Sequence, residues 1–257
     1  MEHVMDEINE ATGVILDACA KKLALAKSDT VRAWCLHKLK HTFEVSNCML
    51  DIMANDPVLA PLSKTDKRKG ELAAILHDLG RFYQDGPCET PHGKVAADLL
   101  SNMGRLADPT ILFAVGVHDT MSIDWMNPHY LSLPEDDKHT AKLLAECLRD
   151  ADKLANIRSF CYHDIPDNIP PSSSLSSDMV AELKKGGSRP LPYSCVRNNI
   201  DEVVVVLVWC FDINFDYTKD AIRKLDYIQF GLDAMRSRGA SDADLALVRE
   251  YLKEFPG

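Results

Sequence analysis

The sequence predicts an all-α protein. Apolar residues recur at intervals of three and four in one segment after another, which is the spacing of one helix face. Signals that start helices, such as Ser28-Asp29-Thr30 and Asp108-Pro109, stand between these segments. Val203–Phe211 contains four consecutive valines and also fits a strand. No other segment offers a strand to pair with, so we interpret it as a buried helix.

The spacing of apolar residues, together with helix-capping and loop residues, divides the first part of the chain into helices. An amphipathic helix is followed by the cap at Ser28, and the next helix carries an apolar stripe that includes His41. A polar loop over 56–69 precedes an apolar run. The helices expected here cover residues 5–27, 28–55, 73–82, 92–103 and 109–118.

The second part begins with a long predicted helix over 135–160. The segment 165–175 contains three prolines and three serines, so we expect a loop and a boundary there. The helices expected beyond it cover residues 177–185, 203–211, 216–237 and 241–255.

Composition narrows the classes of function. The 257 residues carry a formal net charge of −10, which argues against binding a nucleic-acid polymer but leaves small phosphorylated ligands open. The longest apolar run is too short for a bilayer, and acidic residues near the N-terminus argue against a signal peptide. The eight cysteines form no Cys-x-x-Cys pair. We expect a cytoplasmic protein without a membrane contact, and find no signal for an oligomeric state.

One apolar run, Ala73–Phe82, contains the adjacent pair His77-Asp78. If the run is a buried helix, an imidazole and a carboxylate are both taken out of water, which costs several kcal/mol without compensation. A divalent metal compensates both groups because it binds a neutral nitrogen and an anionic oxygen together. The alternative is a His-Asp hydrogen bond inside a core.

Other residues of the types that bind metals also fall on inward helix faces. In the helix over 135–160, Asp150 and Asp152 lie on opposite borders of the apolar stripe, and periodicity leaves both open. The candidates are His41, His77, Asp78, His92, His118, and Asp150 or Asp152.

The order of these residues resembles the HD-domain metal-dependent phosphohydrolase superfamily. The resemblance rests on His41-Thr42-Phe43-Glu44-Val45, Leu76-His77-Asp78-Leu79-Gly80-Arg81 and Asp150-Ala151-Asp152-Lys153-Leu154. It implies a helical bundle over 28–160 that carries the metal site, with 161–257 as a helical extension packed on it in a single domain. It also implies that Asp152 is the last ligand and Asp150 a supporting carboxylate.

His92 and His118 resemble the further ligands of members that hold two metals, with Asp78 as the bridge. The alternatives are a surface histidine at a helix start for His92 and a buried, hydrogen-bonded histidine for His118. Up to four imidazoles and two carboxylates suit one or two ions of Mn or Fe best, with Zn, Co, Ni or Mg also open.

The resemblance implies hydrolysis of a nucleotide or related phosphate ester by a metal-activated water. Asp78 would hold the metal and Asp150 would orient the water or the ligands. Arg81 and Lys153 follow the two metal motifs and would neutralise phosphate charge, although both also fit ordinary surface ion pairs. Two rival readings are a di-iron oxygenase of the same fold and a helical module that binds a nucleotide or a protein partner without turnover.

Overall fold

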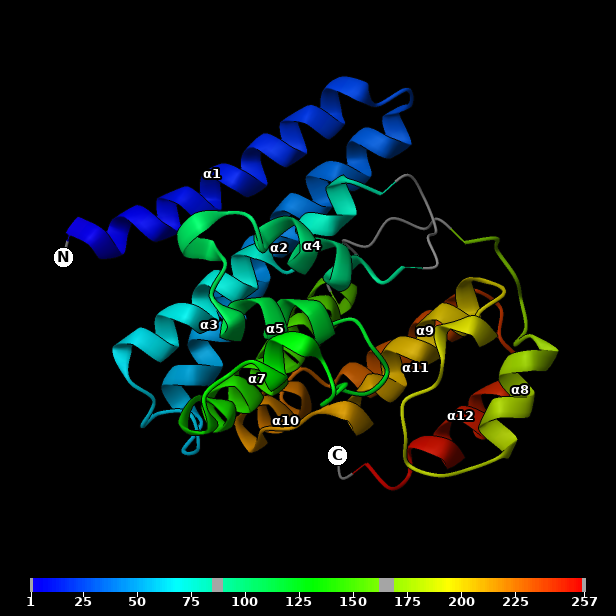
Figure 1. The fold of residues 1–257 in the computed structure, drawn as a ribbon. Coiled ribbons are helices and arrows are strands. Elements are labelled where there is room, and N and C mark those ends of the chain that lie inside the picture. The colour runs from blue at the N-terminus through cyan, green and yellow to red at the C-terminus, as the bar shows by residue number, and fades with distance from the viewer. Residues whose placement is uncertain (1, 85–89, 162–168, 256–257) are drawn as a thin grey trace. The chain divides into compact units, whose positions relative to one another are not determined.

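All regular secondary structure in the described residues of the computed structural model is helical (Figure 1). The described residues are 2–84, 90–161 and 169–255, with side chains described from Glu7 onward. These residues form twelve α-helices and four short 3-10 helices and contain no strand, which confirms the all-α prediction. Chain contacts divide the protein into two compact units, residues 1–155 and residues 156–257. That the second packs on the first as one domain stays a prediction.

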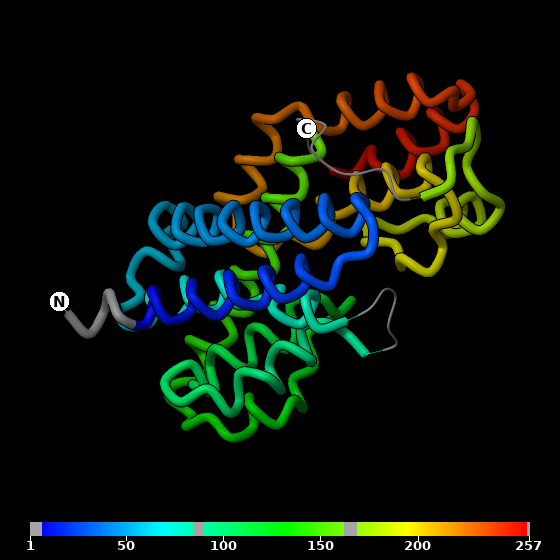
Figure 2. The backbone as a smooth tube through the Cα atoms, turned by 90° about the horizontal axis from the view of Figure 1, so that it is seen from above, coloured from blue at the N-terminus to red at the C-terminus, as the bar shows by residue number. Residues whose placement is uncertain are grey.

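The first unit is built around two long helices, α1 and α2, which run side by side (Figure 1, Figure 2). Helix α3 packs on both, and α5 packs on α3 and on α4. The elements are α1 (Glu2–Leu25), α2 (Asp29–Asn55), α3 (Lys64–Leu76), η1 (Leu79–Phe82), α4 (His92–Leu100), η2 (Gly104–Leu106), α5 (Pro109–Val117), α6 (Pro128–Leu131) and α7 (Glu135–Cys161), whose last turns belong to the second unit.

Two helix starts follow the predicted cap signals. The Ser28 hydroxyl accepts the Val31 N–H at the start of α2, at 3.3 Å. The Asp108 carboxylate accepts the Thr110 N–H at 2.8 Å, with Pro109 at the first position of α5. Both caps satisfy amide groups that the helix itself cannot bond.

The predicted helix over 73–82 is wrong in its bounds. Helix α3 begins at Lys64, inside the predicted polar loop, and ends at Leu76; Asp78 then has φ −93° and ψ 10° and leads into η1. Close packing accompanies the break, because at Gly80 a Cβ atom would lie 2.1 Å from the His92 carbonyl oxygen at the start of α4. His77 and Asp78 therefore lie at the end of a buried helix, where both side chains can reach one point.

The second unit contains α8 (Ser177–Lys184), η3 (Tyr193–Cys195), α9 (Asn199–Val208), η4 (Trp209–Asp212), α10 (Asp216–Arg223), α11 (Tyr227–Ser237) and α12 (Asp242–Leu252). Helix α9 packs on α11, and α12 packs on α8 and α11. The valine-rich segment is helical, as predicted, in α9 and η4. Among the described residues, no helix combines the length and apolar character needed to cross a bilayer.

The predicted single helix over 216–237 is wrong, because this segment forms two helices, α10 and α11. The chain breaks at Asp226, a residue in the left-handed region at φ 48°. Helix α11 then lies close against α9, because Gly231 leaves room for the Leu207 side chain and the buried Tyr227 hydroxyl donates to the Leu207 carbonyl. Close packing on α9 therefore accompanies a change of direction that the sequence periodicity does not show.

Candidate metal centre

The predicted ligands come from five places in the first unit. His41 lies in α2, and His77-Asp78 follow the end of α3. His92 is the first residue of α4, and His118 follows the last residue of α5. Asp152 lies in α7. The fold brings these positions together from across more than a hundred residues of sequence.

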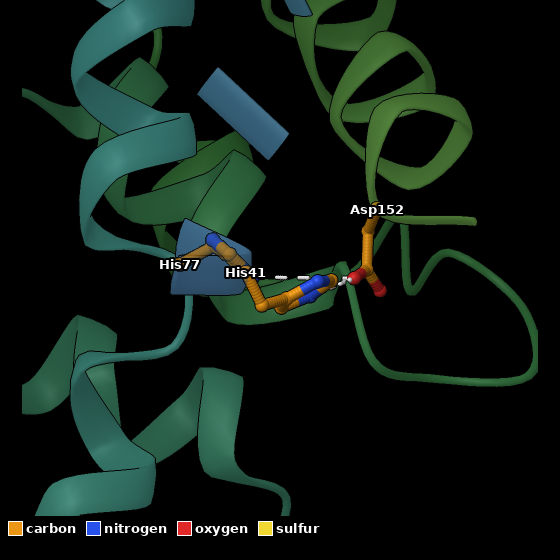
Figure 3. Close-up of side chains that lie close together, drawn as sticks. All are labelled: His41, His77 and Asp152. Atoms are coloured by element: carbon orange, nitrogen blue, oxygen red, sulfur yellow. Dashed lines mark hydrogen bonds and ion pairs between the residues drawn. The ribbon is translucent and has the colours of Figure 1, made fainter. Parts of the chain in front are cut away.

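One group consists of His41, His77 and Asp152, whose ligand atoms all lie within 4.8 Å of one another (Figure 3). The His41 Nε2 atom lies 2.9 Å from Asp152 Oδ1. The His77 Nε2 atom lies 4.0 Å from the same oxygen. These three side chains offer two nitrogens and one oxygen to a single ion.

A second group consists of His77, Asp78 and His118, again within 4.8 Å. His92 joins it, because its Nε2 atom lies 3.0 Å from Asp78 Oδ1 and 3.0 Å from His118 Nε2. Two ligands at right angles on a first-row metal ion, with bonds of about 2.1 Å, are separated by roughly 3.0 Å. The spacing of these atoms therefore fits neighbouring ligands of one ion.

The cluster is buried on most sides. The residues His41, His77, Asp78 and His118 are between 0% and 4% exposed, and His92 is 9% exposed. The Asp152 side chain is 24% exposed. Solvent therefore reaches the cluster at Asp152, whereas the other predicted ligands line its interior.

Hydrogen bonds fix the tautomers of two imidazoles. The Nδ1–H groups of His77 and His118 donate to the carbonyl oxygens of Ala74 and Val115, each at 2.7 Å. Their Nε2 atoms then carry lone pairs that face the cluster. The Nε2 atom of His77 is buried and makes no hydrogen bond. An unpartnered buried lone pair between two carboxylates is a place that a divalent cation fits.

The charges of the cluster also suit a cation. Burial, together with His92 and His77, lowers the pKa of His118 to about 3, so this imidazole is neutral. Burial alone would raise the pKa of Asp78, but the Lys38 ammonium and His77 hold it well below its ordinary value. The hydrogen bond and charge of His41 likewise outweigh burial and lower the pKa of Asp152. Neutral imidazole and ionised carboxylate are the forms that bind metals. Burial would lower the pKa of His92, but its hydrogen bonds to Asp119 and Asp78 raise that pKa, so an ion at this ring has to displace a proton.

The other predicted site residues lie in different surroundings. The Arg81 Nε atom lies 3.4 Å from Asp78 Oδ1, at the edge of the cluster. Lys153 is 9% exposed, and its Nζ atom lies 3.5 Å from the Arg149 carbonyl oxygen. Asp150 is fully buried, on a different side of α7 because it is about 200° around the axis from Asp152. The structure thus brings Arg81 to the predicted ligands but does not bring Asp150 to the face of Asp152.

Two residues of the site were missed by the sequence reasoning. The Lys38 Nζ atom lies 3.0 Å from Asp78 Oδ2, and Asp119 Oδ2 lies 2.8 Å from His92 Nδ1. A signal existed for each. Lys38 precedes His41 by nearly one helical turn, and Asp119 follows His118 as a second His-Asp pair in the chain.

The comparison with known families agrees with this geometry. The HD domain family matches residues 39–157, a segment that spans all six predicted ligands. This segment is an HD domain. The match confirms the resemblance to the HD-domain metal-dependent phosphohydrolase superfamily over somewhat less than half of the chain. No curated protein and no solved structure was found to match the chain.

The match to the HD domain family carries a general expectation about chemistry. HD domains bind divalent metals, and the family is generally hydrolytic. The HD domain of this chain contains the two groups of histidine and aspartate side chains that could hold such ions. Their number and identity, and the ligand set itself, stay predictions.

Removal of metal should destabilise the HD domain. A ligand at 100 times its Kd stabilises a protein by about 2.7 kcal/mol, which corresponds to a rise in Tm on the order of 5–10 °C for a chain of this size. We therefore expect Mn²⁺ to raise the Tm of chelator-treated protein in differential scanning calorimetry. Ca²⁺, which prefers oxygen ligands, is the matched control and should shift the Tm less. Identical curves with and without Mn²⁺, Fe²⁺ and Co²⁺ would contradict the site.

Proposed function

We propose that this protein is a metal-dependent phosphohydrolase that acts on a nucleotide or a related phosphate ester. The observation that carries the proposal is the convergence of His77, Asp78 and His118 in one buried cluster, with Lys38 and Arg81 on the Asp78 carboxylate. The generally hydrolytic chemistry of HD domains supports it.

The ligand set decides which metals suit this role. Four imidazoles and two carboxylates favour Mn or Fe over Mg, which prefers oxygen ligands and retained water. When bound, a divalent ion supplies a water of lowered pKa as the nucleophile and a positive charge for the phosphoryl oxygens.

The residues around the ligands would bind and orient the substrate. Arg81 contacts Asp78 through Nε, at 3.4 Å, and its side chain is 39% exposed. The two terminal nitrogens of its guanidinium would then bind phosphate oxygens at the edge of the site. Lys38 holds the other carboxylate oxygen of Asp78 and keeps that ligand in place. The phosphate contact of Lys153 and the orienting role of Asp150 stay predictions from the sequence, because neither side chain is placed against the predicted ligands.

Arg81→Ala should mainly weaken substrate binding. A hydrogen bond to a charged group contributes about 1.5–3 kcal/mol, and partial exposure places this one at the lower end. We expect KM for the substrate to rise on the order of 10-fold while kcat changes little. Steady-state kinetics on the metal-loaded protein measures both.

The matched control is Arg105→Ala, since Arg105 is a similarly exposed arginine of the first unit that bonds Glu10 at 2.8 Å. Its KM should equal that of the wild type. A fall in kcat at constant KM for Arg81→Ala would contradict a role in ground-state phosphate binding.

The decisive experiment combines metal analysis with turnover. Protein purified anaerobically without chelators is analysed for metals per chain. It is then assayed for phosphate release from nucleoside mono-, di- and triphosphates, and for the appearance of mononucleotide products from dinucleoside polyphosphates. Oxygen uptake is recorded in parallel. Metal-dependent phosphate release that ends after Asp152→Ala is the expected result.

Two other results would overturn the proposal. Oxygen uptake with bound iron and no phosphate release would identify a di-iron oxygenase, which the same six ligands also suit. Nucleotide binding without turnover, unchanged by Asp152→Ala, would identify a non-catalytic binding module.

A further inference from the structure

The three imidazoles of the second group are oriented in two different ways. His77 and His118 each donate Nδ1–H to a carbonyl oxygen three residues earlier in the helix that they end, at Ala74 and Val115. These acceptors come with the helical backbone itself. His92 begins helix α4, so no earlier turn of its own helix can supply a carbonyl in that place.

A carboxylate from another segment fills this role for His92. Asp119 follows His118 at the end of α5, and its Oδ2 atom lies 2.8 Å from His92 Nδ1. The same oxygen accepts the Gly93 N–H at 3.2 Å. The Asp119 side chain is 10% exposed. A buried acceptor with two donors on one oxygen holds the imidazole firmly.

The backbone is arranged to allow this contact. A Cβ atom at Gly93 would lie 2.5 Å from the Val115 carbonyl oxygen and 2.8 Å from both Asp119 Oδ1 and His118 Nδ1. Glycine therefore permits the first turn of α4 to lie against the end of α5. That approach places the His92 ring between Asp119 on one side and Asp78 with His118 on the other.

We propose that Asp119 is a positioning residue of the metal centre. Its carboxylate fixes the tautomer and the direction of the His92 ring, so that the Nε2 lone pair faces Asp78 and His118 and raises the affinity of that group for an ion. The inference rests on the proposed metal site but not on the reaction. In the dipeptide His118-Asp119, His118 thus binds the ion directly, and Asp119 acts on the same ion through His92.

Metal affinity tests this role directly. We expect wild-type protein to bind Mn²⁺ at two positions in isothermal titration calorimetry. In Asp119→Ala the affinity of one position should fall 10–100-fold, as expected for loss of a carboxylate behind a ligand histidine, and the other should be unchanged. Asp119→Asn keeps an acceptor without the charge, so its loss should be smaller. The visible absorption of Co²⁺-loaded protein should change in both variants.

Asp108→Ala is the matched control for a merely structural effect. Asp108 caps the other end of α5, so its loss should lower the Tm without changing either affinity or the Co²⁺ spectrum. The proposal is overturned if every ion bound by the wild type binds Asp119→Ala and Asp119→Asn equally well. It is also overturned if Asp108→Ala causes the same loss of affinity.

The test of Asp119 and the test of the proposed function can fail independently of each other. A protein that binds two ions, loses one in Asp119→Ala and releases no phosphate from any substrate would refute the phosphohydrolase. The assignment of Asp119 would stand. If Asp119→Ala fails to fold, the Asn variant decides the question by itself.

Discussion

Asp78→Ala should remove both the metal and the activity. Asp78 is 1% exposed and contacts His92 through one oxygen and Lys38 through the other, each at 3.0 Å. Its loss deprives the second group of its only carboxylate and leaves a largely buried ammonium without its counter-charge. We expect kcat/KM to fall by more than about 1,000-fold, or about 4 kcal/mol of transition-state stabilisation. Kinetics and metal analysis of the same preparation measure both effects.

Two variants separate chemistry from folding. Asp78→Asn keeps the shape of the side chain and should also lose activity, because an amide does not replace the anionic ligand. Asp98→Ala removes an exposed carboxylate from α4 and should behave as wild type. Full activity in Asp78→Ala would refute the metal site as a whole.

Gly80→Ala should be strongly destabilising. The new Cβ atom would lie 2.1 Å from the His92 carbonyl oxygen and 3.0 Å from the Ala96 amide nitrogen, and both are backbone atoms that cannot rotate away. Either η1 or α4 must move, which separates Asp78 from His92. We expect a cost of about 3 kcal/mol or more, or a fall in Tm on the order of 6–12 °C. Calorimetry measures the stability, and metal titration should show a weakened second position.

The control is a glycine that has open space where its Cβ atom would be. A Cβ atom at Gly13, in the middle of α1, would meet nothing within 4 Å. Gly13→Ala should therefore stabilise the protein by about 0.5–1 kcal/mol, the usual difference between the two residues inside a helix. A Gly80→Ala protein as stable as the wild type would show that η1 and α4 separate easily.

Features with a local cause could be predicted from the sequence. Ser28 and Asp108 start helices because their side chains bond amides two or three residues away. The helical state of Val203–Phe211 followed from the absence of partner strands. The ligand-type residues were found because polar side chains on an apolar helix face are costly unless something binds them.

Features whose cause lies far along the chain could not be predicted from the sequence. Helix α3 ends at Leu76, and Gly80 just beyond it packs on α4, a contact that no periodicity shows. The left-handed Asp226 likewise depends on where α11 meets α9. Asp119 and Lys38 act through partners 27 and 40 residues away, as Asp119–His92 and Lys38–Asp78. Nothing in their own surroundings in the sequence specifies those partners.

The ends of two helices at the cluster have an electrostatic consequence. His77 and His118 are the residues at which α3 and α5 end, so the carbonyl ends of both helices point toward the ligands. The aligned peptide dipoles of a helix place roughly half a negative charge at that end. Two such poles attract a divalent cation and repel an anion. The backbone thus favours metal over phosphate at this point, and a phosphate group approaches these poles only with a cation between them.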